Sequence, residues 1–377
     1  MSRHRSSLLS ISAIAMLAVA VMGCGSSSVP PSSPRATPAS STPSPTPISV
    51  PVLTPAPLDA PLMIQVENLY AARPQSGLSS ADILYEYDTE GGISRFTGIW
   101  FTPPPASDKI GPVRSARLVS LRLLQIYEGA LLYSGASNYT QAQLSASNLH
   151  WYNPNSSQVG STVLYRISSR SAPHNLYSDG SVLATFLQNI NLPKVSYQLW
   201  KRTSLTALPT GGTPVTSFSV PLSQAEHPIF TYEAAQGAYE RDEPGGGGYP
   251  STGVLDDADT SSPWEVPNVV VLQVPVITVA ADNENSANVP WTDGLDFEIG
   301  PNSSGPGQLA VGGQLYPITW TQGATGPPQL TLADGQAAPI APGQVLFELV
   351  SQGSAVTVLS PTPAPTATVS PTASSAG

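Results

Sequence analysis

The residue types that can bind ligands or transfer protons are concentrated in one stretch, residues 81–117. Acidic side chains alternate there with apolar and aromatic ones, a period of two that predicts a β-strand. The acidic face of this strand carries Asp82, Glu86, Asp88 and Glu90. Four carboxylates on one face repel one another, so they need cations, water or a ligand beside them. A solvated outer face with a single ion pair explains the same pattern.

The strand is predicted to turn back at Gly91 and Gly92, because both glycines can adopt positive φ in a two-residue hairpin turn. The register that follows pairs Asp88 with Arg95, Tyr87 with Phe96 and Ile83 with Trp100. One face of the hairpin is then aromatic and suited to a core. The other face is acidic and carries a single arginine.

A helix is predicted over residues 116–127, with Ser115 as its N-cap, because apolar residues recur there at helical spacing. Its apolar surface is broad, so we expect the helix to be buried. Arg114 and Arg117 then lie at its N-terminus, where cations are disfavoured and an anion is needed. That anion is either internal, from the acidic strand, or external, a carboxylate or phosphate of a ligand.

A second group of polar side chains follows at Arg166, Arg170, His174 and Asn175. His174 comes directly after a proline, which predicts that it lies on a loop. Histidine is well suited to proton transfer near neutral pH, so His174 could act as acid or base with Glu86 or Glu90. A structural histidine bonded to a backbone carbonyl is the alternative. A serine nucleophile at Ser115 is unsupported, because no nucleophile-elbow motif surrounds it.

The N-terminus is predicted to be a lipoprotein signal peptide over residues 1–23. A charged start precedes the apolar run 8–21, which is short for a membrane-spanning helix. The small Gly23 before Cys24 resembles a bacterial lipobox, which implies cleavage there and acylation of Cys24 by chains such as palmitate. An ordinary secretory signal is the alternative. Because Cys24 is the only cysteine, a disulfide framework is excluded. We expect a lipid anchor on the extracytoplasmic face of the cell membrane.

Composition divides the remaining chain into four parts. Residues 24–57 and 352–377 are rich in Ser, Pro and Thr and are predicted to be a disordered linker and a disordered tail. Residues 58–195 are predicted to form an N-terminal α+β domain around the β-hairpin and the buried helix. Residues 196–351 consist of short β-like runs between Gly and Pro turns, which predicts a smaller, mostly β C-terminal domain.

The net charge of −10 argues against a nucleic-acid partner, whose binding requires clustered Lys and Arg. The acidic segment that starts at Asp282 is weakly similar to a calcium loop, but it lacks the glycine and the terminal glutamate of an EF-hand. We therefore expect no metal and no cofactor.

Several motifs in one order resemble the YerB-like lipoproteins, a domain-of-unknown-function family of the bacterial envelope. They are Arg-Pro-Gln-Ser-Gly-Leu at 73–78, Ala-Asp-Ile at 81–83, Glu-Gly-Gly-Ile-Ser-Arg-Phe at 90–96, Gly-Pro-Val-Arg-Ser-Ala-Arg at 111–117 and Ala-Pro-His-Asn-Leu-Tyr at 172–177. An Asn-Val-Val-Val strand at 268–271 is similar to the family's C-terminal domain. The resemblance covers most of residues 60–355 and implies a two-domain envelope lipoprotein without an established reaction.

These observations favour binding or scaffolding of an anionic envelope ligand, such as a wall glycan-peptide, or of an envelope protein. The candidate ligand-binding residues are Glu86, Glu90, Arg95, Arg114, Ser115, Arg117, His174 and Asn175. The alternative is a wall hydrolase or transferase with Glu90 or Glu86 and His174 as acid and base, so catalysis stays open. In a third hypothesis the same charges form a purely structural network.

Overall fold

The computed structural model describes residues 57–154, 162–283 and 293–360. The predicted signal peptide, the lipidation site Cys24 and all but the last residue of the linker lie outside these ranges. So do the tail from residue 361 and the calcium-like segment beyond Asn283. In the described ranges, no helix is long and apolar enough to cross a membrane.

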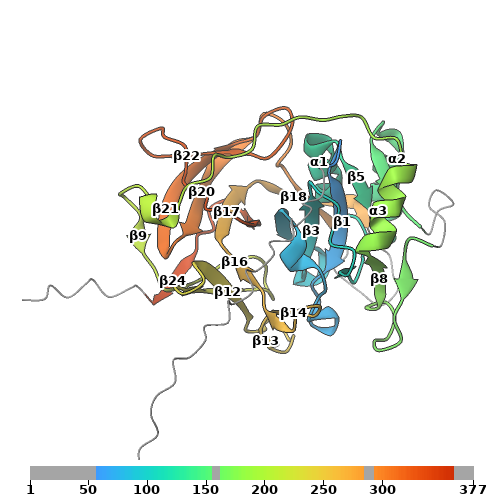
Figure 1. The fold of residues 1–377 in the computed structure, drawn as a ribbon, viewed down its shortest axis with the longest axis horizontal. Coiled ribbons are helices and arrows are strands. Elements are labelled where there is room, and N and C mark those ends of the chain that lie inside the picture. Colours follow the sequence, from blue (N-terminus) through green and yellow to red (C-terminus); the bar gives the residue numbers. More distant parts are fainter. Residues whose placement is uncertain (1–56, 155–161, 284–292, 361–377) are drawn as a thin grey trace, which may run out of the picture. The chain divides into compact units, whose positions relative to one another are not determined.

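The main element of the fold is a sheet of eleven strands (Figure 1). Across the sheet the order is β22 (Gln329–Leu332), β21 (Gln314–Thr321), β20 (Ser304–Val311), β17 (Asn268–Val274), β23 (Val345–Ser351), β2 (Ile83–Asp88), β3 (Ser94–Trp100), β1 (Leu62–Glu67), β5 (Ala130–Leu132) and β6 (His150–Tyr152), with β9 (Thr213–Pro214) paired to β21. The centre of the sheet is the parallel run β17–β23–β2. These strands are nearly continuous in apolar residues because both faces of the sheet are covered.

The two segments predicted as domains both contribute strands to this sheet. β2 comes from residues 58–195 and β23 from residues 196–351, and the two pair directly from Ile83 opposite Val345 to Tyr87 opposite Leu349. The described residues belong to one compact unit, 54–377. The sheet therefore continues across the predicted boundary at residue 195.

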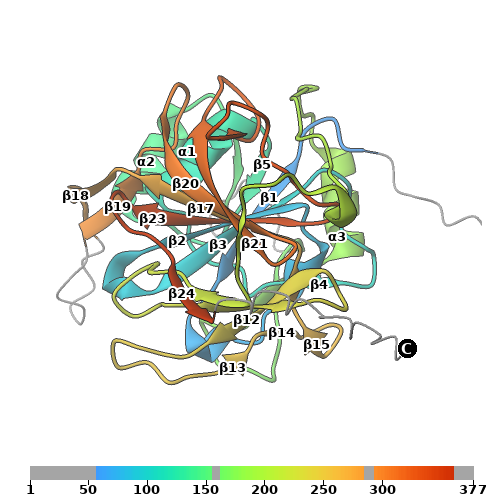
Figure 2. The same ribbon diagram turned by 90° about the vertical axis from the view of Figure 1, so that its left-hand side faces the viewer.

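A second sheet packs against one face of the first. It contains β13 (Gly253–Val254), β12 (Ala238–Glu243), β11 (Ile229–Glu233), β10 (Ser217–Ser219) and β24 (Thr357–Ser360), with β16 (Glu265–Val266) beside β12 (Figure 2). Its side chains Phe218, Phe230 and Tyr239 share a core with Leu84 and Phe96 of the central sheet. The tail predicted to be disordered from residue 352 thus begins with a strand, because its β-prone residues pair with β10.

Three helices, three small sheets and several short 3-10 turns complete the described fold. The helices are α1 (Leu118–Tyr127), α2 (Asn138–Ala146) and α3 (Gly180–Asn189), and the strands are β4 (Lys109–Ile110), β7 (Tyr165–Arg166), β8 (Leu176–Asp179), β14 (Asp256–Asp257), β15 (Ser262–Pro263), β18 (Val276–Asn283) and β19 (Asp293–Phe297). The 3-10 turns are Tyr70–Ala72, Leu78–Ser80, Glu90–Gly92 and Leu205–Ala207. Most of the regular structure is strand, so the fold is mostly β with few helices.

The predicted buried helix is confirmed as α1, which packs on the face of the sheet that carries Tyr85 and Tyr87. Its start was predicted two residues too early. Arg117, not Ser115, is the N-cap, and its backbone N–H donates to Ser120 Oγ over 2.9 Å. Ser115 Oγ instead donates to the carbonyl of Ser134 over 3.2 Å. The serine three positions into the helix satisfies the cap, a contact that composition alone does not distinguish.

The predicted hairpin register is wrong by one residue. Asp88 pairs with Ser94, Tyr87 with Arg95 and Ile83 with Ile99. Gly91 and Gly92 do have positive φ, 83° and 71°, but Glu90 joins them in a three-residue 3-10 turn closed by Thr89 and Ile93. A shift of one residue moves side chains to the other face of a strand. Arg95 therefore lies on the face of Tyr87 and not on that of Asp88.

Candidate functional site

The predicted site residues divide into three groups, of which the first is a buried charge network around Arg241. This arginine, on β12, contacts the carboxylates of Glu86, Glu243 and Glu348. Its Nε donates to Glu243 and its Nη1 to Glu348, each over 2.8 Å. Side-chain exposure is 0–1% for all four residues. This position does not fit the predicted role of Glu86 in ligand binding or proton transfer, because solvent and ligands do not reach it.

The network contains more carboxylates than guanidinium groups. Pairing of β2 with β23 places Glu86 directly opposite Glu348, and like charges in that position repel. Burial, together with the charge of Glu86, raises the pKa of Glu348 well above its ordinary value. This shift favours the protonated form of Glu348. Asn68 Nδ2 and Ser94 Oγ donate to Glu86 Oε1 over 2.8 and 2.5 Å and complete its hydrogen bonds.

The second group is the cluster of Glu90, Arg95 and Arg117 at the start of α1. Arg117 donates through Nε to Glu90 Oε2 over 2.6 Å and through Nη2 to Oε1. Arg95 lies 3.4 Å from the same carboxylate and donates to the carbonyl of Ser115 over 2.9 Å. Their side chains are 5–12% exposed. Of the two arginines predicted at the helix N-terminus, Arg117 therefore has an internal anion, and Glu90 supplies it. The anion beside Arg114 is also internal, but it is Glu67 of β1 and not a residue of the predicted acidic strand.

The third group joins Arg114 and His174 through Glu67, at the end of β1. Glu67 Oε1 accepts from Arg114 Nε over 3.1 Å and lies 3.0 Å from His174 Nδ1. Glu67 is 2% exposed, whereas the side chains of Arg114 and His174 are 27% and 20% exposed. The buried carboxylate of Glu67 thus positions Arg114 and His174, whose side chains reach solvent. We call these three residues the Glu67 cluster.

The tautomer of His174 follows from its contact with Glu67. A carboxylate at Nδ1 favours a proton on that nitrogen, which leaves Nε2 as an acceptor in the neutral ring. Within the described ranges His174 Nε2 has no hydrogen-bond partner, and the buried Glu67 Oε2 has no donor. A carboxylate that orients a histidine in this way supports either anion binding or proton transfer.

Asn175 holds the loop that presents His174. Its Oδ1 accepts from Arg166 Nη1 over 2.6 Å, and its Nδ2 donates to the carbonyls of Ile167 and Arg170 over 3.0 Å. Arg170 also donates to the carbonyl of Pro74 over 2.6 Å and to Tyr177 Oη over 2.9 Å. The predicted gathering of polar residues at 166–175 is therefore present, and Asn175 positions the loop.

Comparisons with known proteins identify the family. The N-terminal domain model of "Protein of unknown function (DUF3048)" matches residues 52–192, and its C-terminal domain model matches residues 218–346. The chain belongs to the DUF3048 family. The predicted resemblance to YerB-like proteins is thereby confirmed.

One curated relative in this family is "Putative lipoprotein YerB" of Bacillus subtilis (strain 168), 24% identical over 305 residues, which are 78% of this chain and 82% of the relative. The crystal structure of the YerB protein from Bacillus subtilis matches with a TM-score of 0.60 at 21% identity, over 79% of this chain and 93% of that one. The structural match shows that the fold is shared. The name of the relative agrees with the lipoprotein predicted from Cys24.

Sequence reasoning missed Glu67 and Arg241, although each left a signal. Glu67 is a charged residue at the end of the otherwise apolar strand LMIQVE, where a buried acid needs partners. Arg241 lies in a segment, 240–249, that its run of four glycines predicts to be a loop, whereas the structure places Arg241 in β12. The alternation in AYERDE is the signal that could have found the strand. In the described part of the chain, no group of three or more His, Cys, Asp or Glu is placed to hold a metal ion.

Proposed function

We propose that this DUF3048 protein is a lipid-anchored envelope protein that binds an anionic group of a wall glycan-peptide, on the extracytoplasmic face. The observation that carries the proposal is the Glu67 cluster, in which a buried carboxylate holds Arg114 and His174 beside each other with both partly exposed. Arg95 and Arg117 contribute less, because their side chains are only 5% exposed, whereas that of Arg114 is 27% exposed. Charge-assisted bonds from a guanidinium to a carboxylate are among the strongest that a surface site can make.

We expect Arg114→Gln to weaken binding of N-acetylmuramyl dipeptide at least about tenfold, since each charge-assisted hydrogen bond contributes about 1.5–3 kcal/mol. Calorimetric titration of the full chain measures this change. The matched control is Arg122→Gln, which removes the same charge from a side chain that is 39% exposed and paired with Asp296. The control is expected to bind like the wild type. Equal affinity of the Arg114 variant and the wild type would exclude this site.

Catalysis on wall glycan is the second candidate, and one observation favours it: His174 Nδ1 lies 3.0 Å from a buried carboxylate. In this second candidate, Glu67 is the carboxylate partner of His174 in place of Glu86 or Glu90, because Glu67 contacts the histidine, whereas Glu86 contacts Arg241 and Glu90 contacts Arg117. An oriented imidazole of this kind contributes about 10²–10⁴-fold to a rate as general acid or base.

If His174 transfers protons, His174→Asn is expected to reduce release of reducing ends from purified wall polymer by at least about 10²-fold without changing the melting temperature. Glu67→Gln should give a smaller loss, since it acts through the histidine. A variant at His174 that keeps full turnover, or a wild-type chain without turnover, would leave binding as the function.

A further inference from the structure

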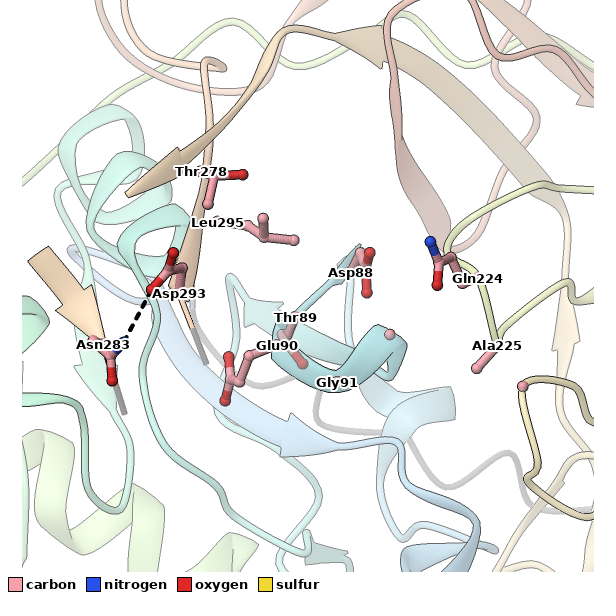
Figure 3. Close-up of a pocket in the computed structure, with 12 residues that line it drawn as sticks. Asp88, Thr89, Glu90, Gly91, Gln224, Ala225, Thr278, Asn283, Asp293 and Leu295 are labelled. Carbon is pink, nitrogen blue, oxygen red and sulfur yellow. Dashed lines mark hydrogen bonds between the residues drawn. The ribbon is translucent and has the colours of Figure 1, made fainter. Parts of the chain in front are cut away.

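A pocket separate from the Glu67 cluster lies where the turn after β2 faces strands β18 and β19 (Figure 3). Its volume is about 600 Å³, which is within the usual range for small organic ligands. One wall carries Thr278, Asp293 and Leu295, and the other carries Gln224 and Ala225. Asp88 lies between the two walls in Figure 3.

Asp88 is the unusual group in this pocket. Its Oδ1 is shielded from solvent and accepts no hydrogen bond within the described residues. Burial raises the pKa of Asp88 to about 7, opposed by the backbone N–H of Thr89 and reinforced by the charge of Glu226. A largely buried carboxylate with one oxygen that lacks a donor is poorly stabilised as an anion, and a cation in the pocket would stabilise it.

The other charges of the pocket do not supply that cation. Glu90 is neutralised by Arg117, outside the pocket lining. Asp293 accepts a hydrogen bond from Asn283 Nδ2 over 3.0 Å, which leaves its negative charge in place. None of the described lining residues is Lys or Arg. The lining is therefore negative, and its carboxylates are too widely spread to share a metal ion.

The remaining lining favours a hydroxylated ligand. Thr278 offers a hydroxyl group, and Gln224 offers an amide that can both donate and accept. Gly91 and Gly92, at positive φ, expose backbone groups in the turn, which Ser223 Oγ fixes by donating to the carbonyl of Gly92 over 2.5 Å. Polar groups distributed around a negative cavity are suited to a ligand that carries several hydroxyl groups and one positive charge.

We propose that this pocket binds the protonated amine of a polar organic ligand, with Asp88 as the counter-ion and the chemistry of an amino sugar as the best fit. This site is separate from the Glu67 cluster and does not depend on it. The amine would offset the uncompensated carboxylate of Asp88, and the hydroxyls of the ligand would bond to Gln224 and Thr278.

The test is calorimetric titration of the full chain at neutral pH with three probes: deacetylated chitobiose, its N,N′-diacetyl form and cadaverine. We expect deacetylated chitobiose to bind at least about tenfold more tightly than the diacetyl form, because acetylation removes the charge. Cadaverine distinguishes the two kinds of ligand that could supply the amine, an amino sugar and an alkylamine. Tighter binding of the sugar assigns the amino sugar, and equal or tighter binding of cadaverine assigns an alkylamine.

Two variants of pocket residues test whether the ligand binds in this pocket. Asp88→Asn removes the counter-ion, and Gln224→Lys places a competing ammonium at an exposed residue, where folding is undisturbed. Each is expected to weaken binding at least about tenfold. Asp256→Asn makes the same charge change at an exposed position outside the pocket and should bind like the wild type. Equal binding of the acetylated and free sugars, no heat with either amine, or wild-type affinity in Gln224→Lys would overturn the proposal.

Discussion

Replacing Arg241 by Met is expected to lower the free energy of unfolding by about 3–5 kcal/mol, which is a large part of the stability of an ordinary domain. Arg241 is fully buried and contacts Glu86, Glu243 and Glu348. The variant leaves Glu86 and Glu348 in the core without a cation, and Glu243 keeps only Arg73, 3.4 Å away. Breaking a buried ion pair from one side costs more than the pair contributes, because the remaining charge is not solvated. Urea denaturation followed by fluorescence measures the loss.

Arg122→Met is the matched control for this prediction. Arg122 also makes a salt bridge, over 2.7 Å to Asp296, but its side chain is 39% exposed. Exposed pairs contribute about 0–1 kcal/mol, so the control should stay within that range. Adding Glu86→Gln to the Arg241 variant should recover part of its stability, since one buried charge disappears. A loss below about 1 kcal/mol in Arg241→Met would mean that the three carboxylates are neutral or hydrated.

A fragment of residues 58–195 is expected to show no cooperative thermal unfolding, although composition predicts it as a domain. Removal of the rest of the chain takes β23 away from β2 and leaves that edge of β2 unpaired. It also removes the second sheet, whose Phe218 and Phe230 cover Leu84 and Phe96. The fragment would expose a large apolar surface to water, which costs about 25 cal/mol per Å². Circular dichroism during heating, with a dye that binds apolar surface, measures this.

The control is the longer fragment 58–360, which keeps every described strand and should melt in one transition. Mixing separate fragments 58–195 and 196–360 should restore that transition, because the β2–β23 pairing can form between chains. Independent, cooperative melting of each half would instead support the predicted boundary at residue 195 as a true domain limit. The outcome also shows whether a substitution in residues 58–195 changes the stability of residues 196–360.

Local features of this chain follow from its sequence. The helix after Arg117, the strands at 83–88 and 268–274, and positive φ at Gly91 and Gly92 were all predicted from periodicity and residue type. These features depend on neighbours within a few residues, so composition and spacing carry the information. The family membership was also accessible, since its motifs are short and occur in a fixed order.

Tertiary structure decided which charges meet. Glu86 was predicted on a solvent-facing or ligand-facing strand, yet it lies beside Arg241, which is 155 residues away in the chain. Glu67 joins Arg114 and His174 from 47 and 107 residues away. One extra residue in the turn after β2 moved Arg95 to the opposite face from the expected one. Sequence periodicity specifies that successive side chains point to opposite faces of a strand. Only the strand order and register determine what covers each face. The sequence therefore determined the elements and the family, and the single sheet shared by both halves determined which of the charged residues are buried support and which can reach a ligand.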